Sequence, residues 1–150
     1  MGPDDIPTVR VESLLARALH RQGELREAED LYRHAVSRQR VHSPPNFLAE
    51  SLIGLGAVLC DQDIPDEAEP IITEGLEINQ QALSEDDWRI AGARIELAGS
   101  LIQQNRLEEA DEQLQIGVEL LEQSTIQDRW INSRAIRFRN QLDDRSTQGR

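Results

Sequence analysis

The chain has 150 residues, of which 38% are apolar and only 3% aromatic. This apolar fraction is low for a compact globule and suits an elongated or repetitive shape. The formal net charge of −12 argues against general attraction to nucleic acid or to anionic membrane surfaces.

Seven helices are predicted in chain order from the spacing of the apolar residues. We expect them near residues 8–22, 25–40, 46–62, 65–82, 87–104, 107–123 and 128–144. Residues 1–7 and 145–150 are expected to be disordered, so that residues 8–144 form a single all-α domain. The last helix, amphipathic but largely polar, is expected to cap an exposed end.

The strongest signal is internal repetition, with three segments that superpose at offsets of 40 and 42 residues. Leu15, Leu55 and Leu97 share one column, and each pairs with a leucine four residues later on the same face of a first helix. We therefore expect three helical hairpins, over residues 8–42, 46–83 and 87–124.

Each hairpin has a turn residue in the same column. Gly23, Asp63 and Asn105 stand where the first helix of each unit should end. These residue types tolerate the left-handed backbone conformation that commonly closes a helix. The sequence therefore predicts three turns of the same kind.

Small and large apolar residues recur on the second helix of each unit. Small residues stand at two columns, where close helix crossing is expected, and larger ones fill two more that we interpret as core. The small columns are Ala28, Ala68 and Ala110, then Ala35, Gly75 and Gly117; the large columns are Tyr32, Ile72 and Leu114, then Val36, Leu76 and Val118.

This pattern resembles the tetratricopeptide repeat, whose consensus spacing is kept by Gly56, Ala68, Ile72 and Gly75. The long period is similar to the kinesin-light-chain type of repeat found in many bacterial proteins. The resemblance implies an α-α superhelix, a right-handed solenoid of three hairpins plus a C-terminal capping helix, with a concave groove that binds a protein or peptide.

The resemblance also implies which positions line the groove, because in this family the first helix of each unit faces it. The expected partner-binding residues are Arg10, Ser13, Arg17, Arg21, Glu50, Ile53, Ala57, Ile95, Glu96, Gly99 and Gln103. Arginine side chains there would orient acidic groups of a partner. The Lys and Asn of the chaperone-tail clamp found in some members are missing, so that type of partner is not expected.

No enzymatic constellation is found. Phosphate loops, nucleophile elbows and Cys/His metal spacings are missing, and we expect no catalytic residue, metal or cofactor. His20 and Cys60 share a column with Ile102, which favours packing over catalysis. An alternative function keeps the fold: a regulatory or substrate-recruiting tail of a larger signalling protein such as a bacterial serine/threonine kinase. A short match, Asp87-Trp88-Arg89-Ile90-Ala91, is similar to a helix opening in such tails.

Charge is unevenly distributed. Residues 43–87 contain eleven acidic residues and no arginine, whereas residues 8–42 contain seven arginines and five acids. A solvated outer helix face explains most of these acids. The pattern also leaves open a weak self-association between basic ends and the acidic centre, or capture of a basic peptide.

The expected location is cytoplasmic. The single cysteine, Cys60, cannot form an internal disulfide, and the first residues do not resemble a secretory signal. The longest apolar run, residues 52–60, falls short of the roughly 18–20 residues needed to span a bilayer.

Overall fold

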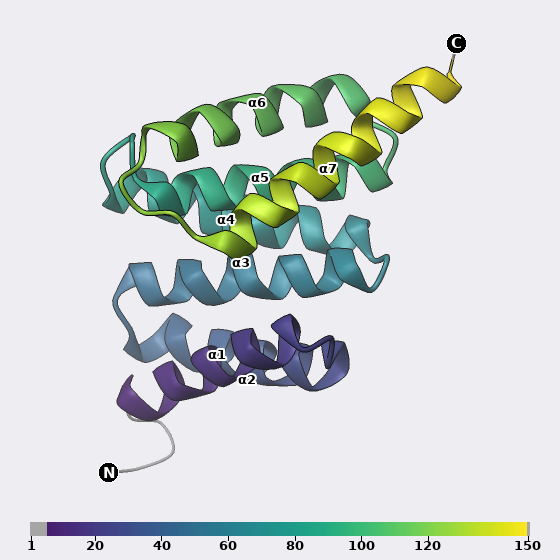
Figure 1. Cartoon of the computed structure of the whole chain (residues 1–150). Coiled ribbons are helices and arrows are strands. Elements are labelled where there is room, and N and C mark those ends of the chain that lie inside the picture. The colour runs from purple at the N-terminus through teal and green to yellow at the C-terminus, as the bar shows by residue number, and fades with distance from the viewer. Residues whose placement is uncertain (1–5, 150) are drawn as a thin grey trace.

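The computed structural model describes residues 6–149, which form seven α-helices and no strand (Figure 1). The helices are α1 (Ile6–Arg21), α2 (Leu25–His42), α3 (Pro45–Asp61), α4 (Pro65–Ala82), α5 (Trp88–Gln103), α6 (Leu107–Gln123) and α7 (Arg129–Gln148). The predicted all-α fold is confirmed, and the predicted bounds of α4 and α6 agree with the structure to the residue.

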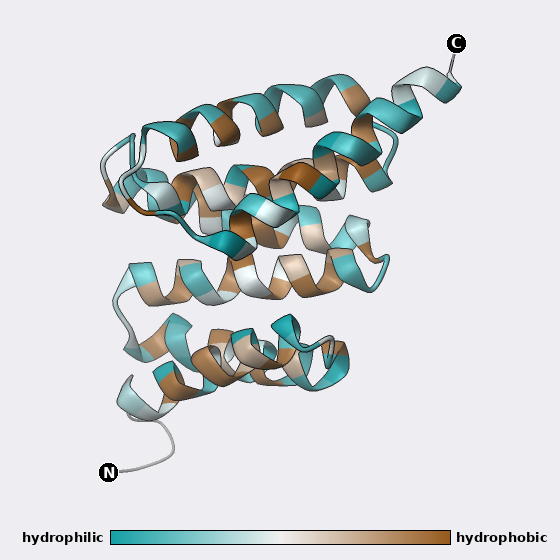
Figure 2. Ribbon diagram, viewed as in Figure 1, coloured by the Kyte–Doolittle hydropathy of each residue, from teal (hydrophilic) through white to brown (hydrophobic). Residues whose placement is uncertain are grey.

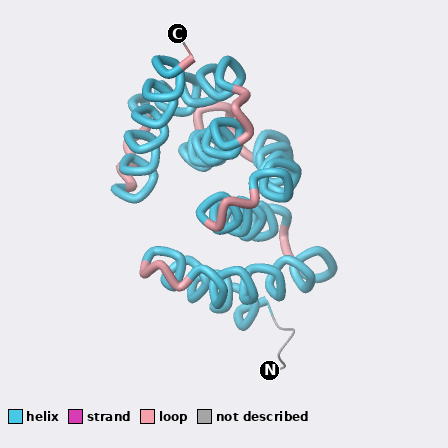
Figure 3. The backbone as a smooth tube through the Cα atoms, turned by 90° about the vertical axis from the view of Figure 1, so that its right-hand side faces the viewer, coloured by secondary structure: helices cyan, strands magenta, loops and turns pink. Residues whose placement is uncertain are grey.

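Three antiparallel hairpins, α1/α2, α3/α4 and α5/α6, stack in chain order into a curved solenoid (Figures 1 and 3). The second and third hairpins each pack their first helix on the second helix of the hairpin before, α3 on α2 and α5 on α4. None of the described helices is long and apolar enough to cross a membrane.

The three turns share one conformation, as the sequence predicts. Gly23, Asp63 and Asn105 have φ angles of 85°, 61° and 60°. In each turn the next residue's N–H donates to the carbonyl of a leucine five residues earlier, and all three N···O distances are 2.9 Å. This is the Schellman arrangement, which satisfies carbonyls left over at the end of the first helix.

The repeat columns form the core of the stack. Hydrophobic residues recur along each of its helices (Figure 2). Gly75 and Gly117 allow the closest helix crossings. An added Cβ would lie 3.1 Å from the carbonyl oxygen of Ala49 at Gly75, and 3.1 Å from that of Ala91 at Gly117. The same close contact therefore recurs one repeat later, between the second helix and the first helix of its own hairpin.

The last helix differs from the prediction in two ways. Helix α7 continues to Gln148, so the tail expected to be disordered from residue 145 is helical there; Arg145 donates to the carbonyl of Ile102 at 2.7 Å. It also does more than cap an end, because it lies diagonally across α5 and α6 (Figure 1). Phe138 packs against Gly99 of α5, where a Cβ would lie 2.5 Å from its ring.

At the other end, α1 begins at Ile6, two residues before its predicted start and within the segment expected to be disordered. The remainder of that prediction, residues 1–5, lies outside the described residues.

The turn at Gly23 generates a stability prediction. An added Cβ there would have nothing within 4 Å, so Gly23→Ala isolates the cost of the left-handed backbone. We expect a loss of about 1 kcal/mol in the free energy of unfolding, measured by urea denaturation. Gly23→Asn is the control and should lose less, because asparagine tolerates this conformation. Equal losses would contradict the conformational explanation.

Candidate functional site

The concave side of the stack contains a cavity of about 260 Å³, called here the groove pocket. Four small residues line it, Gly54 and Ala57 of α3 and Gly92 and Ala93 of α5. Its other lining residues come from α1, α2, α3, α4, α5 and α7: Arg17, His20, Arg21, Tyr32, Asn46, Glu50, Ile53, Asn79, Trp88, Arg89, Glu96, Asp128, Trp130 and Ile131. Every layer of the stack therefore contributes to this one pocket.

Charged side chains at the pocket are paired with one another. Arg17 donates to Glu50 at 3.0 Å, which ties α1 to α3 across the groove. Arg21 lies 3.5 Å from Asp128 and also stands over the Trp130 ring at 5.6 Å. Because these groups are partly exposed, a partner can exchange its own polar groups for these pairs at small cost.

Six of the eleven residues predicted to face a partner line the groove pocket: Arg17, Arg21, Glu50, Ile53, Ala57 and Glu96. Their role in binding stays a prediction. The structure does bring them together from three helices, as the repeat pattern requires.

The other five predicted residues do not line the pocket. Ser13 is buried and hydrogen-bonded to Ser51 at 2.7 Å, while Ile95 is fully buried between α5 and α6. Gly99 lies under Phe138, and the remaining two are turned to the chain itself. Arg10 lies 4.7 Å from the ring of Phe47, and Gln103 donates to the carbonyl of Cys60 at 2.7 Å.

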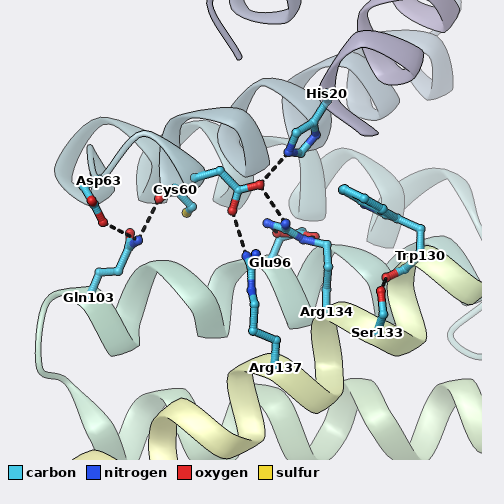
Figure 4. Close-up of polar contacts among 10 residues, drawn as sticks. His20, Cys60, Asp63, Glu96, Gln103, Trp130, Ser133, Arg134 and Arg137 are labelled. Atoms are coloured by element: carbon cyan, nitrogen blue, oxygen red, sulfur yellow. Dashed lines mark hydrogen bonds and ion pairs between the residues drawn. The ribbon is translucent and has the colours of Figure 1, made fainter. Parts of the chain in front are cut away.

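A buried ion network lies beside the pocket and holds α7 in place (Figure 4). Arg134 of α7 is 3% exposed and forms a two-pronged ion pair with Glu96 of α5, with Nη2 2.6 Å from Oε2. Its other terminal nitrogen donates to Asp61 of α3 at 2.8 Å. One buried guanidinium therefore joins three successive layers.

Asp61 is the centre of this network. Besides Arg134, it accepts hydrogen bonds from Arg137 of α7 at 2.7 Å and from Nε2 of His20 at 2.6 Å. A carboxylate only accepts, so the His20 ring nitrogen carries the proton. The Trp130 ring packs edge-on against His20 with a centroid separation of 5.2 Å. His20 is thus buried among packed side chains, in keeping with its repeat column, and it also makes a hydrogen bond that the column did not reveal.

The network perturbs the ionisation of its members. Burial alone would raise the pKa of Asp61, but the hydrogen bond from His20 and the charge and hydrogen bonds of Arg134 and Arg137 outweigh it and hold that pKa well below 3.8. Burial opposes the charged form of Arg134 too, and the two carboxylates still raise its pKa. Both groups therefore stay charged in the folded chain.

Cys60 lies next to Asp61 in sequence, and its ionisation is affected by the network although no ion pair involves it. It is 1% exposed, and burial together with the charge of Glu96 raises the pKa of its thiol to about 12. A thiol in this state is a poor nucleophile and a poor metal ligand. The sequence-based preference for packing over reactivity at this position agrees with its surroundings.

The sequence reasoning missed Arg134, although a signal was present. Trp130, Arg134, Phe138 and Leu142 are spaced four residues apart, so the arginine interrupts the apolar stripe of α7. Glu96 is likewise surrounded by apolar neighbours in α5. Two opposite charges in buried stripes indicate a buried ion pair, because an unpaired buried charge is too costly to keep.

The sequence was compared with models of known protein families. A tetratricopeptide repeat model matches residues 13–46, which run from α1 through α2 to the start of α3. Residues 13–46 are therefore a tetratricopeptide repeat. A search of curated proteins gave no match. The second and third hairpins have the turn and the close crossing described above, so the tetratricopeptide architecture extends through α6.

The tetratricopeptide repeat suggests a protein-interaction module, and the first helices of all three hairpins line the groove pocket. The ion network distinguishes this chain from a plain stack of repeats. Two of its members, His20 and Glu96, also line the pocket.

The ion network predicts unequal roles for two arginines that share Asp61. Arg134→Met leaves Glu96 buried without its partner and should lower the free energy of unfolding by about 3 kcal/mol. Arg137→Met is the control, because Arg137 is 46% exposed, and it should cost less than about 1 kcal/mol. Chemical denaturation measures both values, and similar losses for the two variants would contradict the structure.

The lowered pKa of Asp61 predicts a pH dependence of stability. A carboxyl with a depressed pKa in the folded state stabilises the fold fully above its unfolded pKa, near 3.8, and this stabilisation is lost as the pH falls further. Below about pH 4 the contribution should fall by up to about 1.4 kcal/mol per pH unit.

The test compares wild type with Asp61→Asn by urea denaturation at several acidic pH values. Asp61→Asn should be less stable at neutral pH and should lose less stability on acidification. Glu74→Gln removes an exposed carboxylate paired with Arg40 and serves as the control that keeps most of the wild-type slope. An unchanged slope in Asp61→Asn would show that other carboxylates control acid unfolding.

Proposed function

We propose that the chain binds a protein partner by inserting one large apolar or aromatic side chain of that partner into the groove pocket. The observation that supports this most directly is the composition of the pocket, whose lining combines small glycines and alanines with the large apolar side chains of Trp88, Trp130 and Ile53. The volume of about 260 Å³ lies below the roughly 300–1,000 Å³ typical of small-molecule sites. A side chain of a peptide fits this space better than a whole cofactor.

The polar rim supports a peptide ligand as well. Arg17 and Arg21 stand on one side of the pocket and Arg89 on another, while Glu50 and Asp128 provide acceptors. Such a mixed rim can hydrogen-bond both the N–H and C=O groups of a bound backbone and can favour an acidic residue beside the inserted side chain. It does not form the continuous basic surface that nucleic-acid binding requires.

Helix α7 limits the length of the bound segment. Phe138 and Arg134 already cover the part of α5 near Gly99, which the sequence assigned to the groove. A partner is therefore restricted to the side formed by α1, α3 and the beginning of α5. This space favours a short extended segment or about two turns of helix over a long peptide that spans all three repeats.

The alternative function keeps the same pocket and makes the chain the regulatory or substrate-recruiting part of a larger signalling protein, such as a bacterial serine/threonine kinase. One observation favours it: Trp88 and Arg89, from the short match to such tails, both line the groove pocket. An open reading frame that continues upstream into a kinase domain would support this alternative.

The binding proposal is tested with a phage-displayed library of random linear peptides passed over the immobilised chain. Peptides that contain a large apolar residue should be enriched, and the Arg17→Glu/Arg21→Glu variant should bind them at least about tenfold more weakly. The control variant Arg26→Glu/Arg40→Glu makes the same change in charge on exposed residues of α2 and should bind normally. No enrichment, or equal losses in both variants, would count against the groove pocket.

A further inference from the structure

Neighbouring hairpins contact one another through the second helix of one and the first helix of the next. At each end of the solenoid one of these two helices lacks its partner in the described chain. In the interior, the second helix of one hairpin covers the first helix of the next, as α2 covers α3 and α4 covers α5. No helix precedes α1 in the part of the chain that the structure describes. At the other end, α7 leans toward α5 and leaves part of α6 uncovered (Figure 1).

The repeat columns show what is missing at the first end. Leu55 and Leu97 are 3% and 9% exposed, whereas Leu15, in the same column, is 50% exposed. Val11 and Leu14 are also exposed and lie on the same face of α1. Terminal repeats of a solenoid normally have a polar outer face, so an apolar face here indicates that another element covers it.

The same comparison shows what is missing at the second end. Val36 and Leu76 are buried, but Val118, which follows them in the column, is only partly buried. Val118 lines a cavity of about 510 Å³ between α6 and α7, together with the apolar side chains of Leu121, Ala135 and Ile136. Ile136 is 64% exposed. This cavity, called here the terminal groove, offers apolar surface to a further helix.

The charges of the two ends are complementary. Helix α6 contains six acidic residues and no arginine, and two of the acids, Glu119 and Glu122, line the terminal groove. Arg139 of α7 also lines it and is paired with Asp111 of α6 at 2.6 Å. Helix α1 contains three arginines and one acid, Glu12, which is already paired with His34 of α2 at 2.9 Å. The opposite net charges of α1 and α6 can therefore steer the two ends together, while the exposed apolar side chains of α1 make the direct contact with the terminal groove.

We propose that α1 of a second copy of this chain packs into the terminal groove between α6 and α7, so that molecules associate head to tail. The contact repeats the one made inside the chain, where a first helix packs on the second helix of the preceding hairpin. It joins two different surfaces, so it does not close on itself and it adds molecules one after another. Val11, Leu15 and Ile136 do not line the groove pocket, so the proposal can be tested independently of that pocket.

The test uses two variants, each altered at one end. Val11→Asp/Leu15→Asp changes only exposed residues of α1, and Ile136→Asp changes only an exposed residue of α7, so both variants should fold. Circular dichroism melting checks that they do. Each substitution introduces an aspartate, so an altered α1 and an altered terminal groove carry added negative charge and repel one another.

Sedimentation velocity over micromolar to millimolar concentrations gives the expected results. Wild type should grow beyond a dimer as its concentration rises, and each variant alone should stay monomeric. An equimolar mixture of the two variants should form a 1:1 dimer and no larger species, because one intact α1 and one intact terminal groove remain. Wild-type association should weaken in about 0.5 M salt, where charge attraction is screened.

Four outcomes would overturn the proposal. A wild type that stays monomeric at every concentration would show that a second copy does not cover these ends. Growth that stops at a dimer, or association lost in the α1 variant but kept by Ile136→Asp, would indicate a symmetric contact between two α1 helices. A mixture that stays monomeric would show that the two surfaces do not pair.

Discussion

The two helices of one hairpin cannot bury all of that hairpin's apolar side chains against each other. The rest of the structure depends on this constraint. Leu55 is buried in the stack where α3 packs on α2, and Leu97 is buried where α5 packs on α4. Stability therefore comes from contacts between successive layers, as in other repeat proteins. Curvature, the concave pocket and the exposed apolar ends all result from repeating one contact with a fixed geometry.

The buried charges decide where the last helix lies. An α7 with only apolar side chains could slide along the concave face, because hydrophobic contacts are not directional. Arg134 has to meet Glu96 and Asp61 at the same time, which fixes both the height and the rotation of α7. Such ion pairs contribute little net stability compared with apolar packing, and we interpret this one as a device for position.

The sequence predicted the repeated part of the fold well and the unique part poorly. The same turn conformation recurs in each repeat and depends only on the local backbone. The residues that form it, Gly23, Asp63 and Asn105, could therefore be aligned from the sequence. The docking of α7 has no second copy in the chain, so no column revealed that Arg134 pairs with residues 38 and 73 positions away. Gly99 was assigned to the open groove for the same reason, since its small size is explained only by Phe138.

Helix α7 also supplies part of the lining of the groove pocket. Asp128, Trp130 and Ile131 line the groove pocket and come from the beginning of α7, so the pocket exists in this form only while that helix is docked. A ligand that contacts these residues binds the docked state alone and therefore stabilises it by mass action. His20 lines the pocket and donates to Asp61, so the ligand site and the ion network share a side chain. Binding on the concave face and anchoring of the last helix are thus parts of one equilibrium.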